Sequence, residues 1–245
     1  MVLHGEFCGK VIPVDWVKEV THLKRFVILV MCVCLLCVPV RAAEGEKLVA
    51  LTFDDGPSGR FTRRLLNGLE ERNVKATFLL CGYRMEQYPE LTQKIYEEGH
   101  EIGIHGYSHK SMEFMCRADV SREIEKSMAL IPEGCRVSFL RPPGGICGSC
   151  VQAAAAKQGL AVLSWSVDPR DWATHDTAAI EKEVIAHVRD GDVILLHDMS
   201  DSSVTAALAI IDKLQKQGFR FVTVSELAAA KNVAVTPGTI YTNFK

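Results

Sequence analysis

The sequence has little net charge and lacks the patterns that mark several common binding functions. Its 28 Lys and Arg residues nearly balance its 30 Asp and Glu residues, which gives a formal net charge of −2. Without a basic excess, the chain lacks the electrostatic footprint of a nucleic-acid-binding protein, so we expect no nucleic-acid partner. No glycine-rich fingerprint follows the first predicted strand, which argues against a dinucleotide-binding fold.

Long apolar runs are also scarce. The run over residues 26–38 is short for a membrane-spanning helix, and the basic pair Lys24 and Arg25 precedes it. A positive flank, a short apolar core and small residues at its exit are typical of a secretory signal peptide. We therefore interpret residues 1–43 as an N-terminal extension with a signal peptide, or alternatively a membrane anchor. Either interpretation predicts an exported protein, secreted or attached to the surface of a bacterium.

The cysteines do not form a complete metal or disulfide pattern. Four of the nine lie in the interpreted leader, and five lie beyond it: Cys81, Cys116, Cys135, Cys147 and Cys150. Because five is odd, at least one of these thiols is expected to stay free or to pair with another molecule. Cys147 and Cys150 form a CxxC without the second CxxC of a zinc site. A structural pair, inert thiols and a redox or metal role all stay open for them.

Short apolar strands alternate with amphipathic helices along the rest of the chain. The expected strands are 47–53, 76–80, 101–104, 138–140, 160–165, 192–196 and 219–224. The expected helices are 61–72, 89–98, 121–131, 148–158, 177–188, 204–217 and 225–231. This alternation predicts an α/β domain over residues 44–231, a distorted (β/α) barrel of about seven strands that resembles a TIM barrel. Residues 232–245 are expected to form a loose C-terminal tail.

Polar clusters follow most of the expected strands. They are Asp54-Asp55, His105–His109, Arg141–Gly145, Asp168–Trp172 and Leu196–Asp198. In a (β/α) barrel the carboxyl ends of the strands share one face, so these clusters are expected to meet there. The adjacent carboxylates of Asp54 and Asp55 repel each other, which costs free energy unless a cation or a reaction needs both.

Two histidines four residues apart suggest a metal site. His105 and His109 converge on one ion if the loop between them is tight, and a carboxylate from a neighbouring strand completes a set of three ligands. Three protein ligands with an open position are typical of a catalytic metal site. Zn²⁺ is the expected divalent metal, although Co²⁺, Mn²⁺, Fe²⁺ or Ni²⁺ can bind the same atoms.

Five motifs in order carry a family resemblance: TFDDGPS, HGYSH, RPPGG, DPRDW and LLHD. From about residue 46 to 231, the chain resembles the polysaccharide deacetylases, the NodB-homology or carbohydrate esterase family 4 domain. The resemblance implies a metal-dependent hydrolase that removes N-acetyl groups from an amino-sugar polymer, with peptidoglycan N-acetylglucosamine as the expected substrate. Chitin oligosaccharides, an exopolysaccharide, and a non-catalytic pseudoenzyme that binds glycan are the alternatives.

The resemblance also implies roles for the metal site and the base. Asp55, His105 and His109 match the metal ligands. Asp54 matches the general base that takes a proton from water, and Arg141 matches the cation that keeps this carboxylate charged.

Further roles follow from the same resemblance. His197 matches the general acid that protonates the leaving amine, and Asp171 matches the carboxylate that orients it. The backbone N–H of Gly144 matches the oxyanion donor. Trp172 and Leu195 match the apolar pocket around the acetyl methyl group.

The chain departs from the family pattern at a few positions. Gly144 stands where the family usually has an aromatic residue, so one wall of the groove is expected to be missing and the loop to be looser. Gly106 replaces a usual Ser or Thr, and Ile104 replaces a frequent Asn. These two replacements are expected to alter the hydrogen bonds that support the metal ligands.

Overall fold

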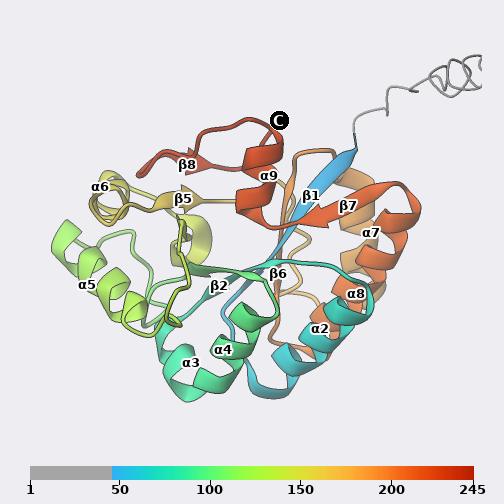
Figure 1. Cartoon of the computed structure of the whole chain (residues 1–245), viewed down its shortest axis with the longest axis horizontal. Coiled ribbons are helices and arrows are strands. Elements are labelled where there is room, and N and C mark those ends of the chain that lie inside the picture. Colours follow the sequence, from blue (N-terminus) through green and yellow to red (C-terminus); the bar gives the residue numbers. More distant parts are fainter. Residues whose placement is uncertain (1–45) are drawn as a thin grey trace, which may run out of the picture. The chain divides into compact units, whose positions relative to one another are not determined.

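A curved sheet of eight strands lies at the centre of the part of the chain that the computed structural model describes, residues 46–245 (Figure 1). The strands are β1 (Lys47–Asp54), β2 (Thr77–Leu80), β3 (Glu101–Ile104), β4 (Phe139–Leu140), β5 (Ala161–Leu163), β6 (Val193–His197), β7 (Phe219–Val222) and β8 (Ile240–Tyr241). All strand pairs in this sheet are parallel. The seven strands predicted from the sequence are all present, at close to the expected positions.

Helices surround the sheet, with α2, α7 and α8 grouped on one side and α5 and α6 on the other (Figure 1). Their bounds are α2 (Gly59–Glu71), α3 (Gly82–Gln87), α4 (Pro89–Glu97), α5 (Arg117–Met128), α6 (Ser149–Lys157), α7 (Thr177–His187), α8 (Asp201–Lys216) and α9 (Val224–Ala230). The sequence predicts all of these helices except α3, a short helix that begins shortly after β2. A 3₁₀ turn over Pro143–Gly145 follows β4.

The sheet curls into a distorted barrel. Its strand order is β6-β1-β2-β3-β4-β5-β8, and β7 pairs with the first half of β1. Backbone hydrogen bonds join the segment after β5 to β6: Leu195 N–H donates to the Val167 carbonyl (2.9 Å) and Ser166 N–H to that of Val193 (3.0 Å). These bonds connect β6, at one end of the sheet, with the segment that leaves β5 near the other end, and the curled sheet confirms the predicted barrel class.

The alternation of β1 separates two environments. Val49, Leu51 and Phe53 pack in the cluster that includes the buried residues of α2, α7 and α8. Leu48 and Ala50 belong to a second cluster, which combines residues from the opposite faces of the strands with residues of α9 and with Phe244. Because side chains alternate along a strand, Thr52 and Asp54 share the face of Leu48 and Ala50. Polar residues therefore replace apolar ones on the inner face as β1 approaches its C-terminal end.

The C-terminal segment is not the loose tail that the sequence predicts. β8 pairs with β5, and Phe244 N–H donates a hydrogen bond to the Gly191 carbonyl (2.8 Å). Phe244 is buried and stacks on Tyr241, with ring centroids 5.4 Å apart. The prediction was wrong because isolated aromatic residues in a short segment give no periodic signal, although their burial fixes the chain.

The interpretation of residues 1–43 as a leader or anchor concerns residues outside the described part of the chain. Within residues 46–245, no helix combines the length and the apolar character needed to cross a membrane.

Candidate active site

The clusters predicted from the sequence meet at the carboxyl ends of the strands, around a cavity of about 450 Å³. The lining residues are Asp54, Asp55, His105, His109, Gly144, Trp165, Asp168, Trp172, Leu195 and His197. They come from the ends of β1, β3 and β6 and from the loops after β4 and β5. Eight of the ten predicted site residues thus share one cavity, and the other two, Arg141 and Asp171, are buried beside it.

Asp54 is the last residue of β1 and is 3% exposed. Its Oδ1 lies 2.6 Å from Nη1 of Arg141, a side chain with no solvent exposure. The same guanidinium donates to Thr52 Oγ1 (2.9 Å) and to the Ser164 carbonyl (2.8 Å). The alternation that turns Thr52 and Asp54 inward therefore provides two of the acceptors that hold this buried cation. The pair compensates a charge that would be costly to bury alone.

Asp55 leaves the strand and points elsewhere. Its φ of 72° lies in the left-handed region, which separates its side chain from that of Asp54. Asp55 Oδ1 lies 2.9 Å from Nε2 of His109 and 3.3 Å from Nε2 of His105. Burial opposes ionisation of Asp55, but the two histidines outweigh it and hold the pKa of Asp55 well below its usual range. Asp55 in turn raises the pKa of His109.

These three side chains fit a divalent cation. Their ligating atoms lie within 4.8 Å of one another. Asp55 Oδ1 is buried, and within residues 46–245 no well-formed hydrogen bond satisfies it. Nδ1 of His105 lies 2.8 Å from the Arg141 carbonyl, an acceptor that requires the proton on Nδ1 and leaves the lone pair on Nε2. The donor set of two imidazoles and one carboxylate is typical of catalytic zinc and related metals.

Asp171 and His197 form a second polar pair at the cavity. Asp171 is 1% exposed, and its Oδ1 accepts a hydrogen bond from Nδ1 of His197 (2.8 Å). Its Oδ2 accepts from the backbone N–H of His197 (2.9 Å). Burial lowers the pKa of His197, but the hydrogen bond and charge of Asp171 outweigh burial, and the pKa rises to about 9. His197 is therefore charged near neutral pH.

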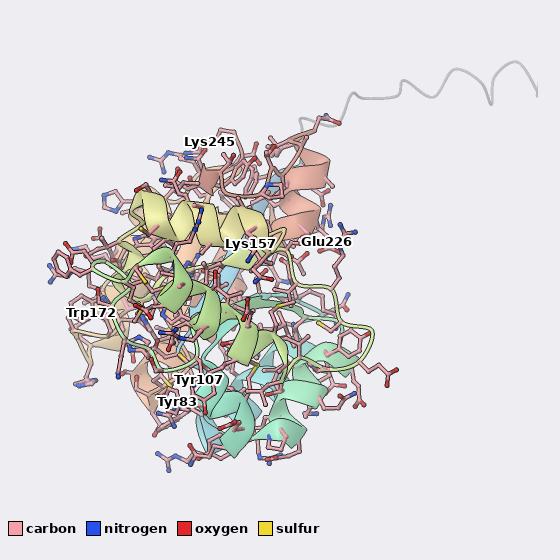
Figure 2. The ribbon with its side chains drawn as sticks, turned by 90° about the vertical axis from the view of Figure 1, so that its left-hand side faces the viewer. Tyr83, Tyr107, Lys157, Trp172, Glu226 and Lys245 are labelled. Atoms are coloured by element: carbon pink, nitrogen blue, oxygen red, sulfur yellow. The ribbon has the colours of Figure 1, made fainter. Side chains whose placement is uncertain are left out.

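The cavity wall is partly open. Gly144 has φ 72° and lies in the 3₁₀ turn, and a Cβ atom added there would meet nothing within 4 Å. The space that an aromatic side chain would occupy next to Gly144 is therefore open at its base. Leu195 is buried, whereas Trp172 is 56% exposed and lies at the edge of the molecule (Figure 2). The two apolar side chains at the cavity therefore differ strongly in their exposure to solvent.

Trp165 and Glu123 contribute to the site without having been predicted from the sequence. Trp165 lines the cavity, and its ring lies 5.6 Å from Cζ of Arg141, within range of a cation–π contact. The ring also lies under Gly145, where an added Cβ would come within 2.5 Å of it. Glu123 of α5 contacts the loop that carries His105 and His109. Neither residue belongs to a polar cluster at a strand end, so the sequence gives no sign of their role. Their place at the site is known only from these contacts in the structure.

A sequence profile described as polysaccharide deacetylase matches residues 41–163. A peptidoglycan-N-acetylglucosamine deacetylase of Bacillus cereus is 37% identical over 195 residues, which cover 77% of this chain and 92% of that protein. The corresponding protein PgdA of Listeria monocytogenes is 35% identical over 78% of this chain, which spans only 41% of PgdA. The solved structure of "T48 deacetylase with substrate" superposes with a TM-score of 0.75 at 32% identity, over 80% of this chain and 96% of that one.

The profile covers half of the chain, the Bacillus cereus relative is matched over nearly its whole length, and the fold and the five motifs agree with both findings. This chain belongs to the polysaccharide deacetylase family.

Proposed function

We propose that this protein hydrolyses the N-acetyl groups of an amino-sugar polymer, with peptidoglycan N-acetylglucosamine as its substrate. One observation carries the proposal. A single cavity holds a carboxylate paired with a buried arginine, a histidine charged by a buried aspartate, and a set of three metal-ligating atoms. Amide hydrolysis needs a base, an acid and charge stabilisation at the carbonyl, and these groups provide all three.

Asp55, His105 and His109 would hold the metal, and we propose Zn²⁺. When bound, such a cation supplies Lewis-acid chemistry: it makes water a nucleophile near neutral pH and polarises the amide carbonyl. Two neutral imidazoles and one carboxylate leave a net charge of +1 on the occupied site. This positive charge also offsets the electrostatic repulsion between the adjacent carboxylates of Asp54 and Asp55.

Asp54 acts as the general base and accepts a proton from the attacking water. Its Oδ1 is bound to Arg141, whereas its Oδ2 lies 3.7 Å from Nε2 of His105, toward the metal-ligating cluster. One oxygen thus anchors the side chain and the other faces the reacting atoms. Arg141 stabilises the charged carboxylate and holds it in place.

His197 acts as the general acid and donates its proton to the departing amine. The pairing of Asp54 with His197 across β1 and β6 places base and acid on neighbouring strand ends. Asp171 binds Nδ1, so Nε2 is the atom that delivers the proton. A pKa of about 9 keeps the donor protonated over the neutral range.

The remaining roles concern the substrate. The backbone N–H of Gly144 donates to the oxyanion that forms at the carbonyl, and Leu195 and Trp172 contact the acetyl methyl group. Both side chains line the cavity, Leu195 buried and Trp172 largely exposed, which suits a small methyl next to a polar sugar. We also propose that the protein is exported, as the leader-like residues before 44 indicate, because an envelope polymer lies outside the cytoplasm.

Acetate release tests the proposal. The purified full chain is loaded with zinc and incubated with peptidoglycan and, separately, with chitin oligosaccharides, with an EDTA-treated sample alongside. The proposal expects acetate from peptidoglycan at a higher rate than from chitin oligosaccharides, and none after EDTA. A zinc-loaded protein that binds glycan and releases no acetate would establish the pseudoenzyme alternative instead.

A further inference from the structure

A tight loop connects the two histidines of the proposed metal site, and one side of its backbone is held by α3. Gly82 N–H donates to the Gly106 carbonyl (2.9 Å), and Tyr83 N–H donates to the Tyr107 carbonyl (3.0 Å). Figure 2 labels Tyr83 and Tyr107 close to each other in the lower part of the view. The carbonyl groups of the loop are thus bound by the first residues of a helix that directly follows a core strand.

The other side of the loop is held by one carboxylate from α5. Oε2 of Glu123 accepts hydrogen bonds from Tyr107 N–H (2.9 Å), from Ser108 N–H (2.7 Å) and from the Ser108 hydroxyl (3.0 Å). Three donors that converge on a single oxygen match a charged carboxylate, because hydrogen bonds to an ionised acceptor are shorter and stronger than neutral ones. Glu123 is half-buried, which protects these bonds from water.

The loop needs such support because its conformation is unusual. Gly106 and His109 have φ values of 76° and 56°, in the left-handed region. A histidine in this region is held there by its surroundings rather than by its own preference. The residue before it, Ser108, makes two of the three bonds to Glu123. His109 is also the most exposed of the three proposed ligands, with 43% of its side chain accessible, so packing alone does not fix it.

We propose that Glu123 is a positioning residue for the metal site: through Tyr107 and Ser108, it fixes the loop so that Nε2 of His109 faces Asp55. The proposal rests on the proposed function, since it takes Asp55, His105 and His109 as the ligands. Glu123 itself does not contact the cation. Its removal leaves the three ligands in the chain but releases the segment between two of them.

The expected effect is on metal affinity. Removal of residues that hold metal ligands typically weakens metal binding about 10- to 100-fold, and we expect a loss in this range for Glu123→Ala. Glu123→Gln keeps one acceptor oxygen and the side-chain length, so it is expected to recover part of the affinity. Glu125→Ala is the matched control, because Glu125 lies two residues further along α5, is exposed and bonds only to Gln158 within residues 46–245.

Cobalt binding to the full chain provides a test that does not use activity. Co²⁺ is titrated into metal-free wild type, Glu123→Ala, Glu123→Gln and Glu125→Ala in competition with a chelator. The dissociation constant and the visible absorption of the bound Co²⁺ are recorded. The melting temperature of each metal-free protein shows whether it is folded, and Glu123→Gln carries the test if Glu123→Ala is not.

We expect Co²⁺ binding to be weakest in Glu123→Ala, intermediate in Glu123→Gln and strongest in the wild type. The Co²⁺ spectrum is expected to change most in Glu123→Ala and less in Glu123→Gln. Glu125→Ala is expected to equal the wild type in both measurements. Wild-type affinity and an unchanged spectrum in a folded Glu123 variant would overturn the proposal and leave the proposed function intact. Failure of the wild type to bind Co²⁺ would overturn the proposed function together with this inference.

Discussion

Removal of the charge on Asp171 is expected to change the protonation of its partner His197. The pKa of His197 is about 9 against an ordinary value of 6.5, a difference of about 2.5 pH units. At 1.36 kcal/mol per pH unit, this difference is worth about 3 kcal/mol between the charged and neutral forms. Only 13% of the His197 side chain is exposed, so screening by solvent removes little of this energy. Asp171→Asn removes the charge that produces most of it.

The effect on stability has a definite sign. The folded state binds the proton of His197 more tightly than the unfolded state does, because the folded pKa is the higher of the two. The stabilisation by the charged pair is therefore fully present below about pH 6.5 and is lost as the pH rises through about 9. Urea unfolding of the metal-free wild type is expected to show this loss, and the Asp171→Asn variant is expected to lack it.

NMR titration of the imidazole groups in the metal-free full chain measures the pKa directly. We expect His197 to titrate near 9 in the wild type and near its ordinary value of 6.5 in Asp171→Asn, because the charges of Asp54 and Asp55 are then all that compensates burial. At pH 7.5, a pKa of 6.5 leaves about a tenth of His197 protonated, so a role as general acid predicts at least a tenfold loss of zinc-dependent acetate release. A His197 that titrates near 6.5 in both proteins would refute the reasoning.

Three further predictions follow from the site. Arg141→Leu leaves the buried carboxylate of Asp54 without its partner and is expected to lower the free energy of unfolding by about 3–5 kcal/mol, measured by urea denaturation. Gly144→Ala is expected to lower the free energy of unfolding by only about 1–2 kcal/mol, since its strain comes from the positive φ alone. Gly145→Ala is expected to lower it more, because the added Cβ would lie within 2.5 Å of Trp165. Equal losses of stability in the two variants would contradict this description of the loop. Addition of Zn²⁺ at 100 times its dissociation constant is expected to stabilise the protein by about 2.7 kcal/mol, and EDTA should reverse the rise in melting temperature; an unchanged melting temperature would mean that no site in the folded protein binds the metal.

Local patterns in the sequence predicted the barrel and the meeting of polar clusters at its strand ends, whereas the family resemblance supplied the roles of the individual site residues. A short, nearly continuous run of buried apolar residues marks β1, and the polar residues at its end follow from the place of functional residues in parallel barrels. The direction of the two adjacent carboxylates also follows from strand geometry, with Asp54 turned inward and Asp55 beyond the strand.

Other features depend on long-range contacts that no local pattern encodes. Phe244 is held by a backbone hydrogen bond to Gly191 and by burial among residues of several strands. These partners are distant in the sequence, so the segment around β8 has no local pattern that predicts a strand. Glu123 is one of several acidic residues on α5. It differs from the others only because its carboxylate accepts three hydrogen bonds from Tyr107 and Ser108, which the sequence does not show. Trp165 is the last residue of the predicted strand 160–165, and the sequence does not show that its side chain lines the cavity.

Acetate release by Asp54→Asn, with zinc content measured in the same samples, tests the central claim most directly. The account predicts that the full-length variant holds zinc as the wild type does, because Asp55, His105 and His109 are unchanged, while acetate release from peptidoglycan falls by at least 10²-fold through loss of the general base. Acetate release at the wild-type rate by a zinc-loaded Asp54→Asn variant would contradict the account.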